Sequence, residues 1–75
     1  MTELQRIREA LKEQETKLRN LRGEKRELSR LHGLDLLDPQ FKAVCAKIRP
    51  DLDPAIEAVM NEIIRLQTRE HKLTF

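Results

Sequence analysis

The sequence predicts an all-α protein in which a long first helix and a third helix form an antiparallel helical hairpin, with a short second helix between them. Three features of the 75-residue chain predict this fold class. Apolar residues recur at helical spacing, two Asp-Pro pairs mark helix starts, and no segment has the pattern of a β-strand. We expect a single domain over residues 1–75, because a chain of this length holds only one small core.

The first helix is expected from about residue 3 to residue 31. Its heptad seam alternates steps of three and four and consists of Leu4, Ile7, Leu11, Gln14, Leu18, Leu21, Lys25, Leu28 and His32. Thr2 and Gln5 have the spacing of a capping box, and Gly33 stands where helices commonly end in a left-handed residue. Gly23 inside the helix either marks the close approach of another backbone or is a tolerated weakness.

The second helix is expected at residues 39–48 and the third at about residues 54–73. Asp38-Pro39 and Asp53-Pro54 each combine an N-cap carboxylate with a proline at the first helical position. The second helix should end before Pro50, because a residue that precedes proline disfavours the α region. The expected apolar faces are Phe41, Val44, Cys45 and Ile48 on the second helix, and Ile56, Val59, Met60, Ile63, Leu66 and Leu73 on the third.

The difference in helix length bears on the oligomeric state. The third helix is expected to be about eight residues shorter than the first, so part of the seam would stay uncovered within one chain. A second copy would cover it, and we therefore expect a homodimer that completes a helical bundle. Polar seam residues such as Gln14 and Lys25 often set register and oligomeric state, or else they face a pocket between the helices.

Cysteine, histidine and hydropathy patterns exclude several classes of protein. Cys45 is the only cysteine, so an intrachain disulfide is excluded, and we expect a small buried hydrophobic residue in a cytoplasmic protein. His32 and His71 lack the spacing of zinc ligands, and neither a metal nor a cofactor is expected. No apolar run is long enough to span a bilayer, and the charged N-terminal region lacks a signal peptide's apolar stretch, so no membrane partner is expected.

A row of charged residues lies beside the seam of the first helix. Six of its seven members are basic, and the row is Arg8, Lys12, Glu15, Arg19, Arg22, Arg26 and Arg30. One interpretation is that the row binds along a nucleic-acid backbone or an acidic protein. The other is that it is the solvated flank of a coiled-coil seam. A net charge of +2, with no aromatic residues among the arginines, argues against nucleic acid. The sequence thus favours an interaction or adaptor protein that presents a charged helix face to a partner, with nucleic-acid binding as an alternative.

Three motifs, in the order of the predicted helices, resemble the all-helical chorismate mutases. They are Arg8-Glu9, then Lys25-Arg26-Glu27-Leu28, then Leu52-Asp53-Pro54 followed by Ile56, Val59, Met60, Ile63 and Ile64. Together they cover about 45 of the 75 residues. The resemblance implies an isomerase that holds both carboxylates of a small substrate with cationic and hydrogen-bonding groups. It implies Arg8, Lys25 and His71 as the catalytic residues.

The sequence also departs from the pattern of that family. Lys25 stands in place of an arginine, and Phe41-Lys42 stands in place of Arg-Glu. On one helix, Arg8 and Lys25 would lie roughly 25 Å apart, so one chain cannot bring both to one small molecule. In an antiparallel dimer, Arg8 of one chain would approach Lys25 of the other, and any such site would be shared. His71 is otherwise an ordinary exposed residue near a helix end.

Overall fold

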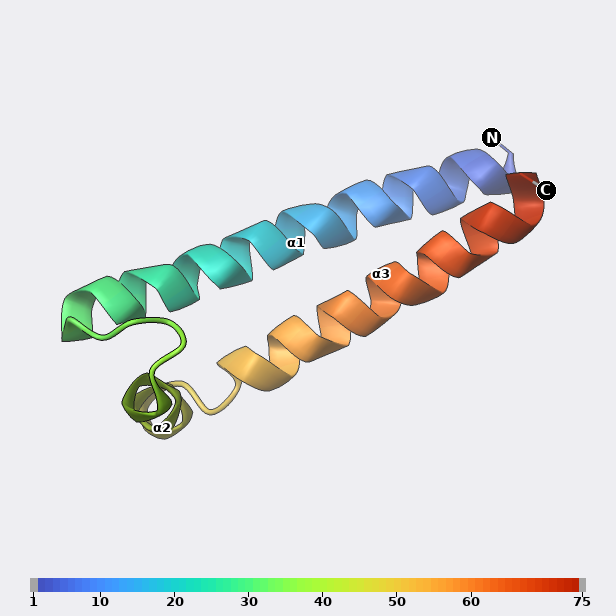
Figure 1. Cartoon of the computed structure of the whole chain (residues 1–75). Helices are drawn as coiled ribbons and strands as arrows, with labels where there is room; N and C mark the ends of the chain where they lie inside the picture. Colours follow the sequence, from blue (N-terminus) through green and yellow to red (C-terminus); the bar gives the residue numbers. More distant parts are fainter. Residues whose placement is uncertain (1, 75) are drawn as a thin grey trace.

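The structure is a computed structural model that describes residues 2–74, and these residues form three helices and no strand. The helices are α1 (Glu3–His32), α2 (Pro39–Ile48) and α3 (Leu52–Thr74). α1 and α3 run antiparallel side by side, and α2 lies at the end of the hairpin opposite the two termini (Figure 1). The molecule measures 46 × 17 × 17 Å. The predicted all-helical hairpin is confirmed.

Both ends of α1 follow the local signals in the sequence. The Thr2 hydroxyl accepts a hydrogen bond from the Gln5 backbone N–H, and the Gln5 side chain accepts one from the Thr2 N–H, which completes the predicted capping box. At the other end, Gly33 has a φ of 63°, in the left-handed region. The N–H groups of Gly33 and Leu34 donate to the carbonyls of Arg30 and Ser29, as in a Schellman motif. α1 therefore ends at His32, one residue beyond the expected end.

The starts of α2 and α3 differ although both contain Asp-Pro. Asp38 caps α2 as predicted, because its carboxylate accepts a hydrogen bond from the Gln40 N–H at 2.8 Å. The same prediction for Asp53 is wrong, since α3 begins at Leu52 and the Ala55 N–H already donates to the Asp51 carbonyl at 3.0 Å. Pro54 is tolerated at the third helical position because N–H groups of the first turn have no partner within the helix. The Asp53 carboxylate does not cap the helix, so it is available to contact another side chain.

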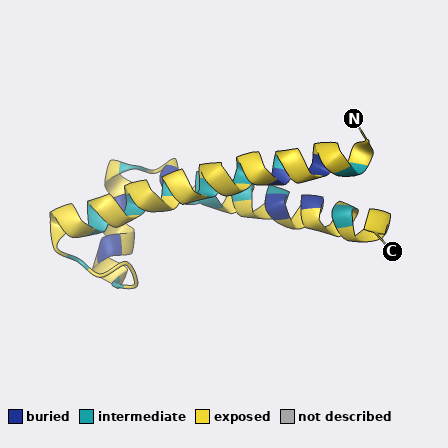
Figure 2. Cartoon of the chain, turned by 90° about the horizontal axis from the view of Figure 1, so that it is seen from above, coloured by how far each residue is buried: buried dark blue, intermediate teal, exposed yellow. Residues whose placement is uncertain are grey.

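The core consists of two clusters along the hairpin. The cluster nearer the termini contains Ile7, Leu11, Ile63 and Leu66, with Ala10, Leu18 and Val59 packed against it. The second, around α2, contains Phe41, Cys45 and Leu52, with Leu21, Leu28, Leu34 and Ile56 packed against it. Figure 2 shows buried positions where α1 faces α3 and on α2, whereas the outer surfaces are exposed.

The expectation of an uncovered seam on α1 is wrong. α3 is shorter than α1, 23 residues against 30, but α2 and Leu34 cover the part of the seam that α3 does not reach. Every apolar seam residue from Leu4 to Leu28 is buried or half-buried, and Gln14 and Lys25 are half-buried too. His32 is exposed and therefore lies outside the packed seam. The uncovered seam was the reason to expect a homodimer, and the structure removes that reason. A homodimer would have to form on another surface.

Large apolar residues are exposed elsewhere on the molecule. They are Leu31, Leu36, Leu37, Ile48, Met60, Ile64 and Leu73. Three of them, Ile48, Met60 and Leu73, were predicted to face the core, and the structure places them outside it. No helix within residues 2–74 is both long and apolar enough to cross a membrane.

Candidate functional site

The charged row predicted on α1 lies on the exposed surface of the hairpin. All seven of its residues are exposed, and we call them the basic stripe: Arg8, Lys12, Glu15, Arg19, Arg22, Arg26 and Arg30. Six basic groups and one acidic group give the stripe a net charge of +5, whereas the whole chain has +2, so the other residues carry −3. Charge is therefore segregated onto one side of one helix.

Only the two ends of the basic stripe are neutralised by nearby carboxylates. Arg8 Nε lies 3.3 Å from Glu70 Oε2 on α3, and Arg30 Nη2 lies 2.6 Å from Glu27 Oε1. The four cations between them have no carboxylate partner in the described part of the chain, and they are Lys12, Arg19, Arg22 and Arg26. From Lys12 to Arg26 they extend over roughly 21 Å of helix.

Arginines outside the stripe are paired more completely. Arg49 contacts both Asp51, at 3.3 Å, and Glu24, at 3.4 Å. Its hydrogen bonds hold the pKa of the Asp51 carboxyl below its usual value. Arg65 contacts Glu62 at 2.5 Å and likewise lowers the pKa of that carboxyl. Five cations outside the stripe also form no ion pair among the described residues, and they are Arg6, Lys17, Lys42, Lys47 and Lys72. The stripe differs from them because four of its cations lie along one row of one helix.

Gly23 opens a hollow in the middle of the basic stripe. The hollow has a volume of about 420 Å³ and is lined by Glu15, Leu18, Arg19, Arg22, Gly23 and Arg26. A Cβ atom at Gly23 would meet no atom of another segment within 4 Å, so no other backbone among residues 2–74 approaches it closely. Gly23 therefore marks the close approach of another backbone only if that backbone belongs to a separate molecule.

The three residues that the chorismate mutase resemblance implies do not share one site in a single chain. Arg8 pairs with Glu70, the residue before His71, so Arg8 reaches the end of α3 that contains the histidine. Lys25 stands 17 positions from Arg8 on the continuous helix α1, roughly 25 Å away. Its Nζ lies 2.8 Å from Asp53 Oδ1, with side chains 29% and 39% exposed. A dianion at Lys25 would have to displace this carboxylate.

Comparisons with family models, curated proteins and solved structures give no match. The resemblance to the chorismate mutases therefore rests on the sequence motifs alone. No group of three or more potential metal-binding side chains occurs within residues 2–74.

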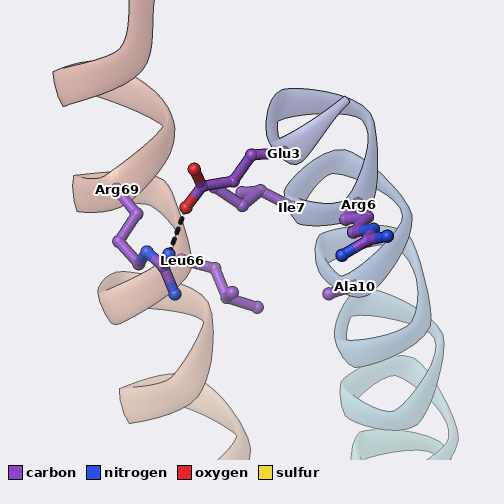
Figure 3. A pocket seen from close by; sticks show the side chains of 6 residues that line it. All are labelled: Glu3, Arg6, Ile7, Ala10, Leu66 and Arg69. Atoms are coloured by element: carbon purple, nitrogen blue, oxygen red, sulfur yellow. Dashed lines mark hydrogen bonds and ion pairs between the residues drawn. The ribbon is translucent and has the colours of Figure 1, made fainter. Parts of the chain in front are cut away.

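An open hollow near the termini is lined by an ion pair between the two long helices. It has a volume of about 480 Å³ and is lined by Glu3, Arg6, Ile7, Ala10, Leu66 and Arg69. Figure 3 shows Glu3 on α1 and Arg69 on α3 reaching toward each other across the gap, where their side chains form an ion pair. Because Arg69 is matched by a carboxylate of its own chain, Arg6 is the one cation lining this cavity that has no ion pair among the described residues.

A second cavity, near α2, combines apolar walls with unpaired cations. It has a volume of about 260 Å³ and is lined by Arg22, Lys25, Arg26, Leu36, Leu37 and Ile56. A further hollow shares Lys25, Leu36 and Leu37 with it and extends to Phe41, Lys42 and Asp53. Arg22 and Arg26 belong to the basic stripe, so the stripe borders an apolar depression at this end.

Farther along the hairpin, α3 exposes two more apolar residues, Met60 and Ile64. Met60 lies beside the stripe, since Arg22 Nη2 is 4.0 Å from Met60 Sδ. Ile64 is one helical turn farther along the same side of α3. Sequence reasoning missed this feature, although the doublets Val59-Met60 and Ile63-Ile64 signal it. Neighbouring residues on a helix point about 100° apart, so only one of each doublet can face α1.

Proposed function

We propose that the chain is an interaction module that binds an acidic polypeptide through the basic stripe of α1. The observation that supports this proposal is the run of four cations, from Lys12 to Arg26, without carboxylate partners among the described residues. Like charges three and four positions apart destabilise a helix by a few tenths of a kcal/mol per pair. Among the four cations, Arg19–Arg22 and Arg22–Arg26 are such pairs, and Glu15 lies beside Lys12 and Arg19 only. An anionic partner offsets the repulsion that remains.

The surroundings of the stripe favour a polypeptide over nucleic acid. Met60 and Ile64 expose apolar surface next to the cations, and a phosphate backbone has no apolar group that could pack against it. Single strands are commonly held by aromatic stacking, but the sequence has only two aromatic residues, and one of them, Phe41, is fully buried. An acidic polypeptide supplies both carboxylates and apolar side chains.

Fluorescence anisotropy with a labelled glutamate-rich peptide, in about 50 mM salt, tests the proposal. Arg19→Glu should weaken binding about tenfold, because it removes one charge-assisted contact and adds a repulsive one. Lys17→Glu is the matched control, since it changes the net charge equally but lies outside the stripe on an exposed position of the same helix. Equal loss in the two variants would show that net charge alone attracts the peptide and would contradict the proposal.

Binding of duplex DNA in the same assay distinguishes the proposed function from the alternative, nucleic-acid binding. Four unpaired cations on phosphates would give a slope of about −3.6 for log affinity against log salt. We expect the peptide to bind more tightly than the duplex at every salt concentration. A duplex that binds more tightly than the peptide, and with that slope, would replace the acidic polypeptide with nucleic acid as the partner.

A further inference from the structure

The surface between α1 and α3 on the side of the basic stripe has the composition of a helix-binding groove. We define the groove by its apolar floor, Leu36, Leu37, Ile56, Met60 and Ile64, with the basic stripe as one border. Leu36, Leu37, Met60 and Ile64 are 41%, 92%, 40% and 58% exposed. Ile56, Met60 and Ile64 follow one another at intervals of four and extend along α3 for roughly 12 Å.

We infer that an amphipathic α-helix of a partner protein, with glutamate or aspartate along one edge, docks in this groove and completes a three-helix bundle. The inference rests on the proposed function, and it specifies the form of the acidic polypeptide. The apolar face of that helix covers the groove floor, and its acidic edge lies against Lys12, Arg19, Arg22 and Arg26. Helices that dock in grooves combine an apolar face with a charged border in this way.

The charges that border the groove determine which side of the groove the acidic edge of the partner helix faces. The cations border the groove on the α1 side, where Glu15 is the only carboxylate of the stripe. On the α3 side, the nearby carboxylates are Asp53, which is paired with Lys25, and Glu57. An acidic edge toward α3 would meet Glu57, so the acidic edge must face α1. A second copy of this chain fits poorly at low salt, because it would bring its own basic stripe to the same surface.

The backbone of the hairpin limits the form of the occupant. α1 and α3 are helices, whose backbone groups bond within each helix, so the groove offers no sheet edge to an extended peptide. Side chains of a third helix can enter the cavity of about 260 Å³ between Arg22, Leu36 and Ile56, as ridges enter grooves in helix packing. A flat lipid surface would leave that cavity unfilled.

Two synthetic peptides of identical composition test the inference by titration calorimetry in about 50 mM salt. The first spans about three heptads, with leucine at the two seam positions and glutamate along one edge. The second has the same residues in scrambled order, so that it keeps the charge but has no apolar face. We expect the periodic peptide to bind at least tenfold more tightly than the scrambled peptide.

Variants of exposed residues show where the periodic peptide binds. Met60→Ser/Ile64→Ser should weaken binding of the periodic peptide at least tenfold and leave the scrambled peptide unaffected. The matched control is Leu73→Ser, which also removes an exposed apolar side chain of α3 but lies outside the groove. Circular dichroism confirms that each variant keeps its helices.

The possible outcomes separate this inference from the proposed function. Tighter binding of the periodic peptide that depends on Met60 and Ile64 supports the groove. Equal binding of both peptides, with sensitivity to Arg19→Glu alone, overturns the groove but keeps the proposed function. If neither peptide binds, both are overturned. Binding to phosphatidylserine vesicles that depends on Met60 and Ile64, without peptide binding, would replace the partner helix with a membrane.

Discussion

At the scale of single residues, Lys25 shows how a polar side chain is accommodated in a leucine-rich seam. The sequence left two interpretations open, a residue that sets register or a ligand in a pocket. The structure places its Nζ 2.8 Å from Asp53 Oδ1, in a pair that is neither fully buried nor freely solvated. Asp53 is available because α3 begins one residue before it, and a carboxylate in the first turn also interacts favourably with the helix dipole.

Lys25→Met and Asp53→Ala should therefore affect stability differently. Lys25→Met replaces a partly buried cation with an apolar side chain between Leu21 and Leu28, and we expect an unchanged or slightly higher Tm. Asp53→Ala leaves Lys25 without its partner and removes a helix-start charge, so we expect a loss of about 1 kcal/mol. Thermal unfolding followed by circular dichroism measures both. A larger loss for Lys25→Met than for Asp53→Ala would show that the pair itself stabilises the fold.

Cys45 is the other residue whose role the structure decides. It is 1% exposed and packs with Phe41 and Leu52, which confirms the sequence prediction of a small buried hydrophobic residue. Burial raises the pKa of its thiol above the usual value, and the nearby charge of Asp53 raises it further. The thiolate that a nucleophile requires is thereby disfavoured.

At the scale of elements, helix ends were predictable where a short motif determines them. Thr2 with Gln5, Asp38-Pro39 and Gly33 each act within one turn, and the structure confirms all three. The start of α3 was predicted two residues too late, because proline is compatible with any position of the first turn and does not specify which one it takes. The cover that α2 gives to the seam was not predictable either, since it depends on where the loop of residues 33–38 directs the short helix.

Replacing each of the two glycines with alanine should change the stability of the protein in opposite directions. Gly23 lies within the helix with open space around it, so Gly23→Ala should stabilise the protein by about 1 kcal/mol and raise Tm by about 4–8 °C. Gly33 has a φ of 63°, so Gly33→Ala should destabilise it by a similar amount, although space is equally open there. Thermal unfolding of the two variants side by side is the measurement. A loss of stability in Gly23→Ala would mean that a contact outside the single chain already occupies the hollow.

At the scale of the whole molecule, the segregation of charge determines which functions the fold can support. The seam, the cluster nearer the termini and the caps of α1 and α2 all have sequence signals, whereas the packing of α2 in the second cluster depends on the loop. The groove has only a partial signal, because the doublets Val59-Met60 and Ile63-Ile64 indicate apolar residues beyond the core face of α3, whereas Leu36 and Leu37 belong to no helical stripe. Its recognition required the arrangement of α1 beside α3, and this is why the basic stripe was found from the sequence but its apolar neighbours were not.

The same segregation predicts how the homodimer inferred from the sequence would respond to salt. With the seam covered, two copies would have to pair through exposed apolar surface, and the groove is the surface where Met60, Ile64, Leu36 and Leu37 gather. Pairing there brings two basic stripes of net charge +5 together, so repulsion opposes it until salt screens the charges. Binding of an acidic peptide should instead weaken as salt increases.

Light scattering at low micromolar concentration measures this response. We expect a mass near 8.9 kDa in about 20 mM salt and an increase toward twice that value in about 1 M salt, where the Debye length is only about 3 Å. Met60→Ser/Ile64→Ser should abolish the increase, and Leu73→Ser should not. A dimer that dissociates on addition of salt would place the contact on a region of mixed charge, such as the ion pairs around Arg49 or those around Arg65. A monomer at both concentrations would contradict the homodimer altogether and leave the groove to a different chain.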